Sequence, residues 1–298
     1  MTAQGERQEQ VYKVAVADVG SNSVRILTIG ADGKLYDDLF YLRAGVQEYF
    51  VLLEDVMLPY EKAEKKVMVA TEYWRKHKGE FIELKDFAEA GGWEIELLTP
   101  EREGILAWKG VEFLDGASFE CLVDIGGGSF EVIKRGGEVY SWGFGAVVLK
   151  NRADEILGST DAQGSKRVET LERILADELT GFKLGVKRVV GIGGAVVAVA
   201  MASKGVKKVE DINGKLLKFD EVEAFIDVVS GMTLDKRKEL FGEGRGDIVL
   251  EGAVILKKLM ECLEVEKIKT SIAGIVHGVM SEVLNEHYPD IKKFLSKV

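Results

Sequence analysis

The sequence predicts an α/β protein built from two similar domains. At 298 residues the chain is roughly twice the length of an average domain. The segment 18–23 reads Asp-Val-Gly-Ser-Asn-Ser, and the segment 124–129, which lies 106 residues later, reads Asp-Ile-Gly-Gly-Gly-Ser. In each half the apolar patterns predict three strands, then a helix, a strand, a helix and a strand, an order typical of α/β folds. The repeat therefore indicates two domains of one design.

The first half opens with three expected strands, at 14–17, 24–30 and 35–43. Asp32-Gly33 marks the turn between the second and third of them. Residues 44–65 have no clear period and predict at most a short helix. The remaining elements are a strand at 66–70, a helix over 71–90 that ends at Gly91-Gly92, a strand at 94–98, and a helix from Thr99 to Phe113 with Thr99 as N-cap and Pro100 next to it.

The second half repeats this order after about residue 118. Expected strands lie at 120–124, 131–134, 139–142, 187–190 and 267–272, and expected helices at 165–180, 195–202 and 247–263. Asp220 and Glu223 resemble a capping box for a further helix that bears Val222, Phe225, Ile226 and Val229, and a terminal helix is expected from about Gly278. These elements predict a first domain over 1–116 and a second over 117–284. A C-terminal helix of about 285–298 is expected to pack on the first domain.

Composition and charge exclude several classes of protein. The net charge is −10, and no Lys and Arg cluster suggests a general nucleic-acid surface. No stretch approaches the ~18 apolar residues of a membrane span, and the polar start of the chain lacks the apolar core of a secretory signal. We therefore expect a cytoplasmic protein that binds neither nucleic acid nor membrane. Cys121 and Cys262 have no metal-ligand spacing and are expected in the core.

The repeated turn carries the chemistry that the sequence predicts. An aspartate at the end of an apolar strand, followed by glycines and a hydroxyl, places backbone N–H groups beside a carboxylate. This pairing suits a phosphate chain that carries Mg²⁺. Aspartate also favours turns for purely structural reasons, but its occurrence in both copies favours a functional role. Because the protein is acidic, a polyanionic substrate needs Mg²⁺ or a local basic lining.

Six motifs follow one another in a recognisable order, at 18–25, 70–75, 101–104, 124–131, 141–145 and 191–194. Together they resemble the exopolyphosphatase and guanosine pentaphosphate phosphohydrolase family, which belongs to the acetate kinase, sugar kinase, Hsp70 and actin superfamily. The resemblance extends from about Val14 to Glu282. It implies two ribonuclease H-like domains of the actin-like ATPase fold, with an interdomain cleft in which the substrate lies.

The resemblance also implies roles for individual residues. Glu103 corresponds to the base that activates the attacking water, and Glu131 and Arg75 are further catalytic residues. Asp18, Asp124 and Glu131 are assigned to a Mg²⁺ cofactor. The phosphate-binding residues that it implies are Ser21, Asn22, Ser23, Arg25, Gly126, Gly127, Gly128, Ser129, Gly143, Gly145, Gly193 and Gly194.

Each of these residues also has a structural interpretation. Glu103 suits the first turn of any helix, because acids there oppose the helix dipole. Arg25 and Arg75 are also candidates for surface charges or ion pairs between domains. Gly193-Gly194 lacks dinucleotide-site spacing and could merely allow close packing. The three histidines, His77, His277 and His287, share no metal-ligand spacing and are expected to be structural or exposed.

Four features depart from the family pattern. Residues 44–65 look too short for the full first-domain helix of relatives. Ala195 replaces the threonine of a Gly-Gly-Thr motif, and Val276-His277 replaces the Arg-Glu pair of a Gly-Leu-Arg-Glu-Gly motif. The chain also ends without the helical C-terminal domain of longer members. These changes bear on nucleotide selectivity.

The sequence thus predicts a phosphohydrolase that releases orthophosphate from the end of inorganic polyphosphate or from guanosine pentaphosphate. Two alternatives are a phosphotransferase of the same superfamily and a non-catalytic sensor that binds polyphosphate or an alarmone. The sequence leaves open whether the protein forms a homodimer.

Overall fold

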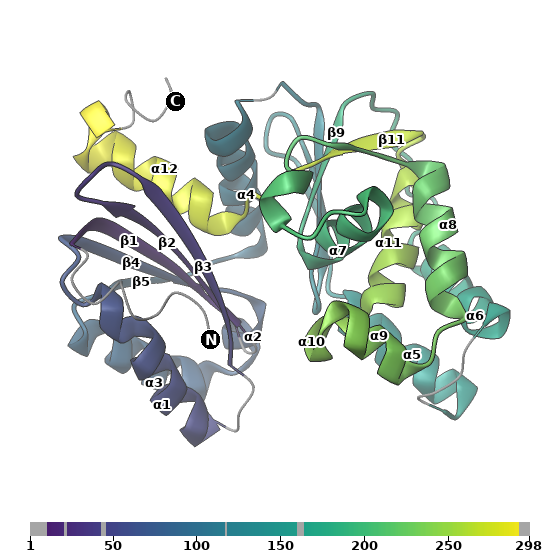
Figure 1. Ribbon diagram of the computed structural model, residues 1–298, viewed down its shortest axis with the longest axis horizontal. Coiled ribbons are helices and arrows are strands. Elements are labelled where there is room, and N and C mark those ends of the chain that lie inside the picture. The colour runs from purple at the N-terminus through teal and green to yellow at the C-terminus, as the bar shows by residue number, and fades with distance from the viewer. Residues whose placement is uncertain (1–10, 21–22, 43–45, 117, 160–163, 292–298) are drawn as a thin grey trace. The chain divides into compact units, whose positions relative to one another are not determined.

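The computed structural model describes residues 11–20, 23–42, 46–116, 118–159 and 164–291 (Figure 1). Among these residues, no helix combines the length and the apolar character needed to cross a membrane.

The chain divides into two compact units, and each contains one mixed sheet with helices against it. The first unit comprises Met1–Leu114 together with Gly274–Val298, and the second comprises Asp115–Ala273. The first boundary lies close to the expected residue 116. The return to the first unit lies at Gly274 rather than at the expected residue 285, because the apolar side chains of 276–284 join the core of the first sheet.

The sheet of the first unit has the strand order β3-β2-β1-β4-β5. Strands β1, β2 and β3 pair antiparallel, whereas β4 and β5 extend the sheet in parallel from β1. The bounds of these strands are Tyr12–Val19 for β1, Ser23–Gly30 for β2, Leu35–Tyr41 for β3, Lys65–Ala70 for β4 and Glu94–Leu97 for β5.

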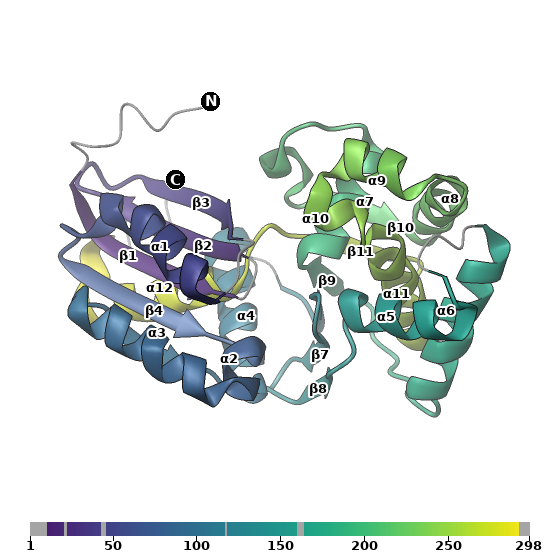
Figure 2. The same cartoon turned by 90° about the horizontal axis from the view of Figure 1, so that it is seen from below.

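Helices cover both faces of this sheet, so its central strand is apolar on both sides. Ala15 and Ala17 of β1 belong to the cluster that contains the apolar residues of α1 (Val46–Met57) and α3 (Lys78–Ala90). Val14 and Val16 belong to the cluster that contains residues of α4 (Pro100–Asp115) and α12 (Ile275–His287). Figure 2 shows α1 in front of the strands and α12 behind them.

Two segments of the first unit differ from expectation. Residues 46–57 form a full helix rather than a short one, because Tyr49, Leu53 and Met57 align on one face and are buried. The expected helix over 71–90 is two helices, α2 (Glu72–Lys76) and α3, since the backbone at His77 leaves the helical region with φ −116° and ψ 64°. The short 3₁₀ helix η1 spans Leu58–Tyr60.

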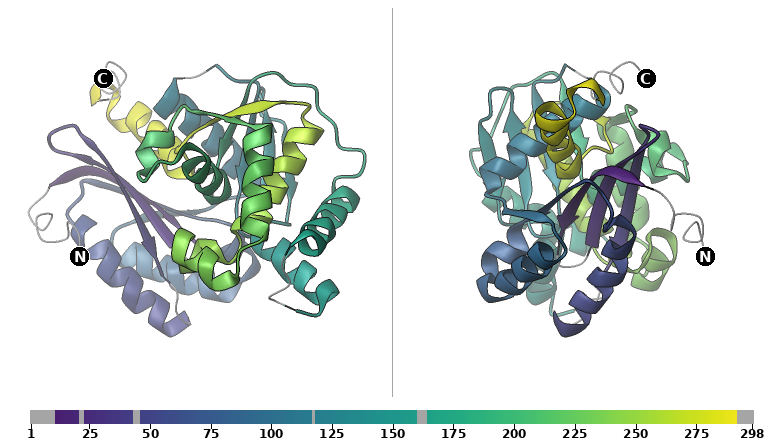
Figure 3. Two further views of the ribbon diagram at one scale, coloured as in Figure 1. Left: turned by 45° about the vertical axis from the view of Figure 1, so that its right-hand side comes forward. Right: turned by 90° about the vertical axis from the view of Figure 1, so that its left-hand side faces the viewer.

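The sheet of the second unit has the order β10-β11-β9-β6-β7-β8. Its strands are β6 (Cys121–Ile125), β7 (Phe130–Lys134), β8 (Val139–Trp142), β9 (Val189–Ile192), β10 (Leu216–Lys218) and β11 (Lys267–Thr270). Its helices are α5 (Ala146–Leu157), α6 (Ser165–Glu178), α7 (Gly194–Lys204), η2 (Val209–Ile212), α8 (Phe219–Ser230), α9 (Leu234–Phe241), α10 (Glu243–Gly246) and α11 (Val249–Cys262). Figure 3 shows this unit from two further sides, with α8 and α11 as green and lime ribbons that pack together.

Helices α5, α9 and α10 were not expected from the sequence, and α8 starts earlier than expected. The capping residue of α8 is Lys218, whose N–H donates to a carboxylate oxygen of Glu221 at 2.8 Å. The expected capping pair of Asp220 and Glu223 is therefore wrong, because the helix begins at Phe219.

The two sheets share one design, as the repeat predicted. The order β3-β2-β1-β4-β5 corresponds to β8-β7-β6-β9-β11, and β10 is an additional edge strand. The two turns close in the same way. The Gly20 N–H donates to the Ser23 carbonyl at 2.9 Å, and the Gly126 N–H donates to the Ser129 carbonyl at 3.0 Å.

Candidate functional site

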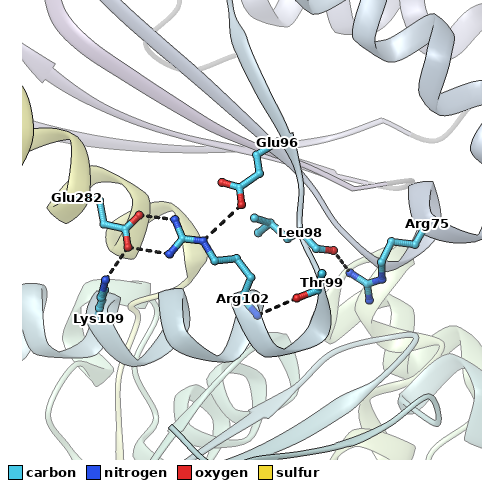
Figure 4. Close-up of polar contacts among 7 residues, drawn as sticks. All are labelled: Arg75, Glu96, Leu98, Thr99, Arg102, Lys109 and Glu282. Atoms are coloured by element: carbon cyan, nitrogen blue, oxygen red, sulfur yellow. Dashed lines mark hydrogen bonds and ion pairs between the residues drawn. The ribbon is translucent and has the colours of Figure 1, made fainter.

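Glu103 and Arg75 meet at the carboxyl end of the parallel strands in the first unit. Arg75, on α2, donates to the Leu98 carbonyl at 2.7 Å (Figure 4). It also donates to a carboxylate oxygen of Glu103. Thr99 caps α4 by accepting the Arg102 N–H at 3.2 Å, which places Glu103 in the first turn. The side chain of Glu103 is only 13% exposed. The helix start, the strand end and the arginine thus hold one carboxylate in a defined orientation.

Aromatic residues fix the turn after β1. The Trp74 indole N–H donates to the Val19 carbonyl, and the Tyr49 hydroxyl donates to the Gly20 carbonyl, both at 2.7 Å. Burial raises the pKa of Tyr49, and the charge of Asp18 raises it further, so the phenol stays a hydrogen-bond donor. Of the residues that we expected to bind phosphate here, Ser21 and Asn22 lie outside the described residues, and Ser23 begins β2.

Arg25 lies opposite Asp18 in the β1–β2 pair, but its guanidinium is engaged elsewhere in the first unit. It forms a bidentate pair with Asp37 of β3, through Nε at 2.9 Å and Nη2 at 2.5 Å. The buried imidazole of His277 lies nearby, with its Nε2 atom 3.8 Å from Asp37. Among the described residues, Arg25 therefore forms an ion pair within the first unit.

In the second unit, the segment predicted to bind phosphate at Gly143–Gly145 holds the glycine turn in place. The N–H groups of Gly145, Ala146 and Val147 donate to the carbonyls of Gly128, Gly126 and Gly127 at 2.8, 3.1 and 2.8 Å. A Cβ atom on Gly145 would lie 2.6 Å from the Gly126 and Gly127 carbonyl oxygens, so only glycine fits there.

This contact orients the peptide groups of the turn. Within the described residues, the N–H groups of Gly127 and Gly128 form no backbone hydrogen bond, while their carbonyls point to the start of α5. Successive backbone N–H groups in a turn form a concavity that binds anions when they have no hydrogen-bond acceptor within the chain. These two N–H groups are the donors in this turn that the sequence analysis expected to bind phosphate.

Two carboxylates flank this turn. Asp124 and Glu131 are directly paired across β6 and β7, so their side chains share one face of the sheet. Glu131 is 8% exposed and accepts a hydrogen bond from the Ser141 hydroxyl at 3.0 Å. Gly193, with φ +92°, leaves room for Asp124, since a Cβ atom there would lie 2.7 Å from the Asp124 Oδ1 atom.

The carboxylate pair fits a hard cation that keeps part of its hydration shell. No group of three or more His, Cys, Asp or Glu side chains among the described residues is arranged to hold a metal. Mg²⁺ is usually bound by one or two carboxylates, with water and substrate phosphate as the other ligands. The donors that Asp124 and Glu131 offer match that pattern.

Arg245, on α10, was not among the residues expected from the sequence. It lines a cavity of about 90 Å³ together with Gly126, Gly127, Gly194 and Ala195. Its guanidinium has no ion-pair or hydrogen-bond partner within the described parts of the chain. A neighbouring cavity of about 780 Å³, which is mostly apolar, shares Ala198 and Arg245 with the small one. No sequence signal marked Arg245, because α10 is too short to show a period.

This chain is similar to one known protein family and to several solved structures. The model of the Ppx/GppA phosphatase family matches residues 51–287. A crystal structure of the Ppx/GppA enzyme of Aquifex aeolicus is 26% identical, with a TM-score of 0.77 over 90% of this chain and 98% of that one. A second structure of the Aquifex aeolicus family member is 27% identical, with a TM-score of 0.77 over 92% of this chain and 98% of that one.

An exopolyphosphatase from Cytophaga hutchinsonii has the same fold at 16% identity, with a TM-score of 0.77 over 92% of this chain and 98% of that one. A search of curated protein sequences gives no significant match. The expected fold of two actin-like α/β domains is confirmed by these structures. The chain therefore belongs to the Ppx/GppA phosphatase family.

Proposed function

We propose that the protein is a Mg²⁺-dependent phosphohydrolase that releases orthophosphate from the end of inorganic polyphosphate. The observation that carries the proposal is the pair of Glu103 and Arg75, in which a partly buried carboxylate at a helix start is oriented by an arginine. Membership of a phosphatase family supports the same reaction class.

Glu103 is the proposed general base. Its carboxylate takes a proton from a water molecule while the water oxygen forms a bond to the terminal phosphorus. The bond between that phosphorus and the bridging oxygen breaks, and the shortened chain keeps the bridging oxygen. Arg75 holds the carboxylate in place and offers further N–H donors to phosphate oxygens.

The second unit supplies phosphate binding. The N–H groups of Gly127 and Gly128 donate to phosphate oxygens, and Asp124 and Glu131 would hold Mg²⁺. When bound, the cation neutralises phosphate charge, which matters for a protein with a net charge of −10.

The first test compares two glutamates in one helical turn. Glu103→Gln should lower phosphate release from polyphosphate on the order of 10²- to 10⁴-fold, because it removes the base but keeps the shape. Glu101→Gln is the matched control, since Glu101 lies on an exposed part of the same turn. It should keep nearly full activity. Equal rates for wild type and Glu103→Gln would remove Glu103 from the mechanism.

Guanosine pentaphosphate is the second candidate substrate. The large cavity beside the glycine turn favours testing it, because a nucleoside needs an apolar space next to a phosphate site. Phosphate release should be compared for polyphosphate, guanosine pentaphosphate, ATP and GTP, each with Mg²⁺ and with EDTA. Full activity in EDTA would contradict the proposed cation requirement.

A further inference from the structure

We propose that Glu282, on α12, is a positioning residue that holds α4 so that Glu103 faces Arg75. This inference rests on the proposed role of Glu103 as the base. It assigns a task to a carboxylate that lies 179 residues further along the chain and does not contact Glu103 itself.

The contact is an ion-pair cluster that involves the first and third turns of α4 (Figure 4). The guanidinium of Arg102 donates two parallel hydrogen bonds to Glu282, from Nη1 at 2.8 Å and Nη2 at 2.5 Å. The ammonium of Lys109 donates to the same carboxylate at 2.6 Å. Two basic residues of one helix thus hold one acid of another.

The spacing of these residues fixes the rotation of α4 about its axis. Arg102 and Lys109 are seven residues apart, which is close to two full turns, so both point to α12. Glu103 follows Arg102 directly and therefore points about 100° away around the helix. Anchoring Arg102 on one side consequently directs Glu103 to another side, where Arg75 meets it.

The packing of α4 on α12 supports this anchoring. A Cβ atom on Gly278 would lie 2.0 Å from the Leu106 carbonyl oxygen, and one on Gly110 would lie 2.4 Å from the Gly274 carbonyl oxygen. Glycines let the two backbones approach closely, so α4 and α12 are in direct backbone contact at this crossing. The Glu282 cluster adds a polar contact between the same two helices, and this contact opposes rotation and sliding of α4.

The cluster keeps its charges over a wide pH range. Burial alone would raise the pKa of Glu282, but the hydrogen bonds from Arg102 and Lys109 outweigh it and lower that pKa. The paired guanidinium and carboxylate are each about one-third exposed, so the cluster contributes modestly to stability. Because this contribution is small, the effect of the cluster on the position of Glu103 can be measured separately from its effect on stability.

The experiment compares Glu282→Gln with Glu94→Gln. Glu94 forms an ion pair with Lys65 at 2.6 Å in the same unit and has no hydrogen bond or ion pair with α4 among the described residues. Glu94→Gln therefore removes a charge pair elsewhere in the unit. Glu282→Gln should lower kcat for polyphosphate by about tenfold or more, with little change in KM, because misplacement of a reacting group acts on the chemical step. Glu94→Gln should change neither.

A second comparison separates positioning from folding. If Glu282 acts through Glu103, then adding Glu282→Gln to the Glu103→Gln variant should not lower its residual rate further. A purely structural role would reduce that residual rate by the same factor as in wild type, which would overturn the inference. Arg102→Lys should show a weaker loss of the same kind, because a lysine cannot form the two parallel bonds.

A spectroscopic measurement tests the inference without turnover. In protein labelled with ¹³C at glutamate carboxyl groups, the signal that disappears in Glu103→Gln identifies Glu103. Glu282→Gln should shift this signal, and Glu94→Gln should leave it in place. An unmoved signal in Glu282→Gln would overturn the inference. A wild-type protein that releases no phosphate would instead contradict only the proposed function.

Discussion

Gly193 shows how closely the backbone of the second unit surrounds Asp124. The residue follows β9 and precedes α7, and its φ of +92° lies in the left-handed region that favours glycine. A Cβ atom there would lie 2.6 Å from the Ile125 carbonyl oxygen and 2.7 Å from Asp124. From the sequence, Gly193 had two interpretations, phosphate contact and close packing, and the structure demonstrates the packing requirement.

We predict that Gly193→Ala lowers the free energy of unfolding by roughly 2–4 kcal/mol and also lowers phosphate release, because the added methyl group displaces Asp124. Gly194→Ala is the matched control, since a Cβ atom on Gly194 meets no atom within 4 Å. Urea unfolding and phosphate release of both variants check this prediction. Comparable stability of the two variants would contradict it.

At the scale of elements, the start of α5 illustrates a helix that tertiary contacts define. Its N-cap is Gly145, which has no side chain to cap the helix, and the first N–H groups instead bond to the glycine turn. A cap-based search of the sequence therefore had no signal to find. The start of α4 is the opposite case. The sequence predicted Thr99 as N-cap and Pro100 as the first helical residue, and the structure confirms both positions.

The crossing of α4 and α12 gives the prediction at this scale. Gly278→Ala should lower the free energy of unfolding by about 3 kcal/mol, because its methyl group would overlap the Leu106 carbonyl and force the helices apart. Gly79→Ala is the control, since Gly79 lies in α3 with no atom within 4 Å of the new Cβ. That variant should gain about 0.5–1 kcal/mol from its higher helix propensity. Denaturant unfolding distinguishes the two; destabilisation of both would show that the crossing is not the cause.

At the scale of the whole molecule, stability should depend on pH through the buried imidazole of His277. Burial lowers the pKa of His277 to about 3, the positive charge of Arg25 lowers it too, and Asp37 opposes this only in part. Within the described residues its Nδ1 atom has no hydrogen-bond partner. The folded protein therefore keeps this histidine neutral down to strongly acidic pH.

The unfolded chain protonates the same histidine below about pH 6.5, so it binds more protons than the folded state between about pH 6.5 and 3. The stability that the neutral, buried His277 contributes is fully present above this pH range and is lost as the pH falls through it. We expect a loss of about 2 kcal/mol between about pH 8 and about pH 5. Urea unfolding at both pH values should show a smaller loss for His277→Gln, and an equal loss would assign the effect to other groups.

The sequence by itself determined the α/β class, the repeat, the family and the turns at 18–23 and 124–129. These features depend on local patterns, such as apolar period and glycine placement, which are written along the chain. The partners of Arg25 and Glu282 and the helices α5 and α10 were decided by the tertiary structure. Each depends on residues far apart in the chain, and only folding brings their charges and backbone groups within bonding distance.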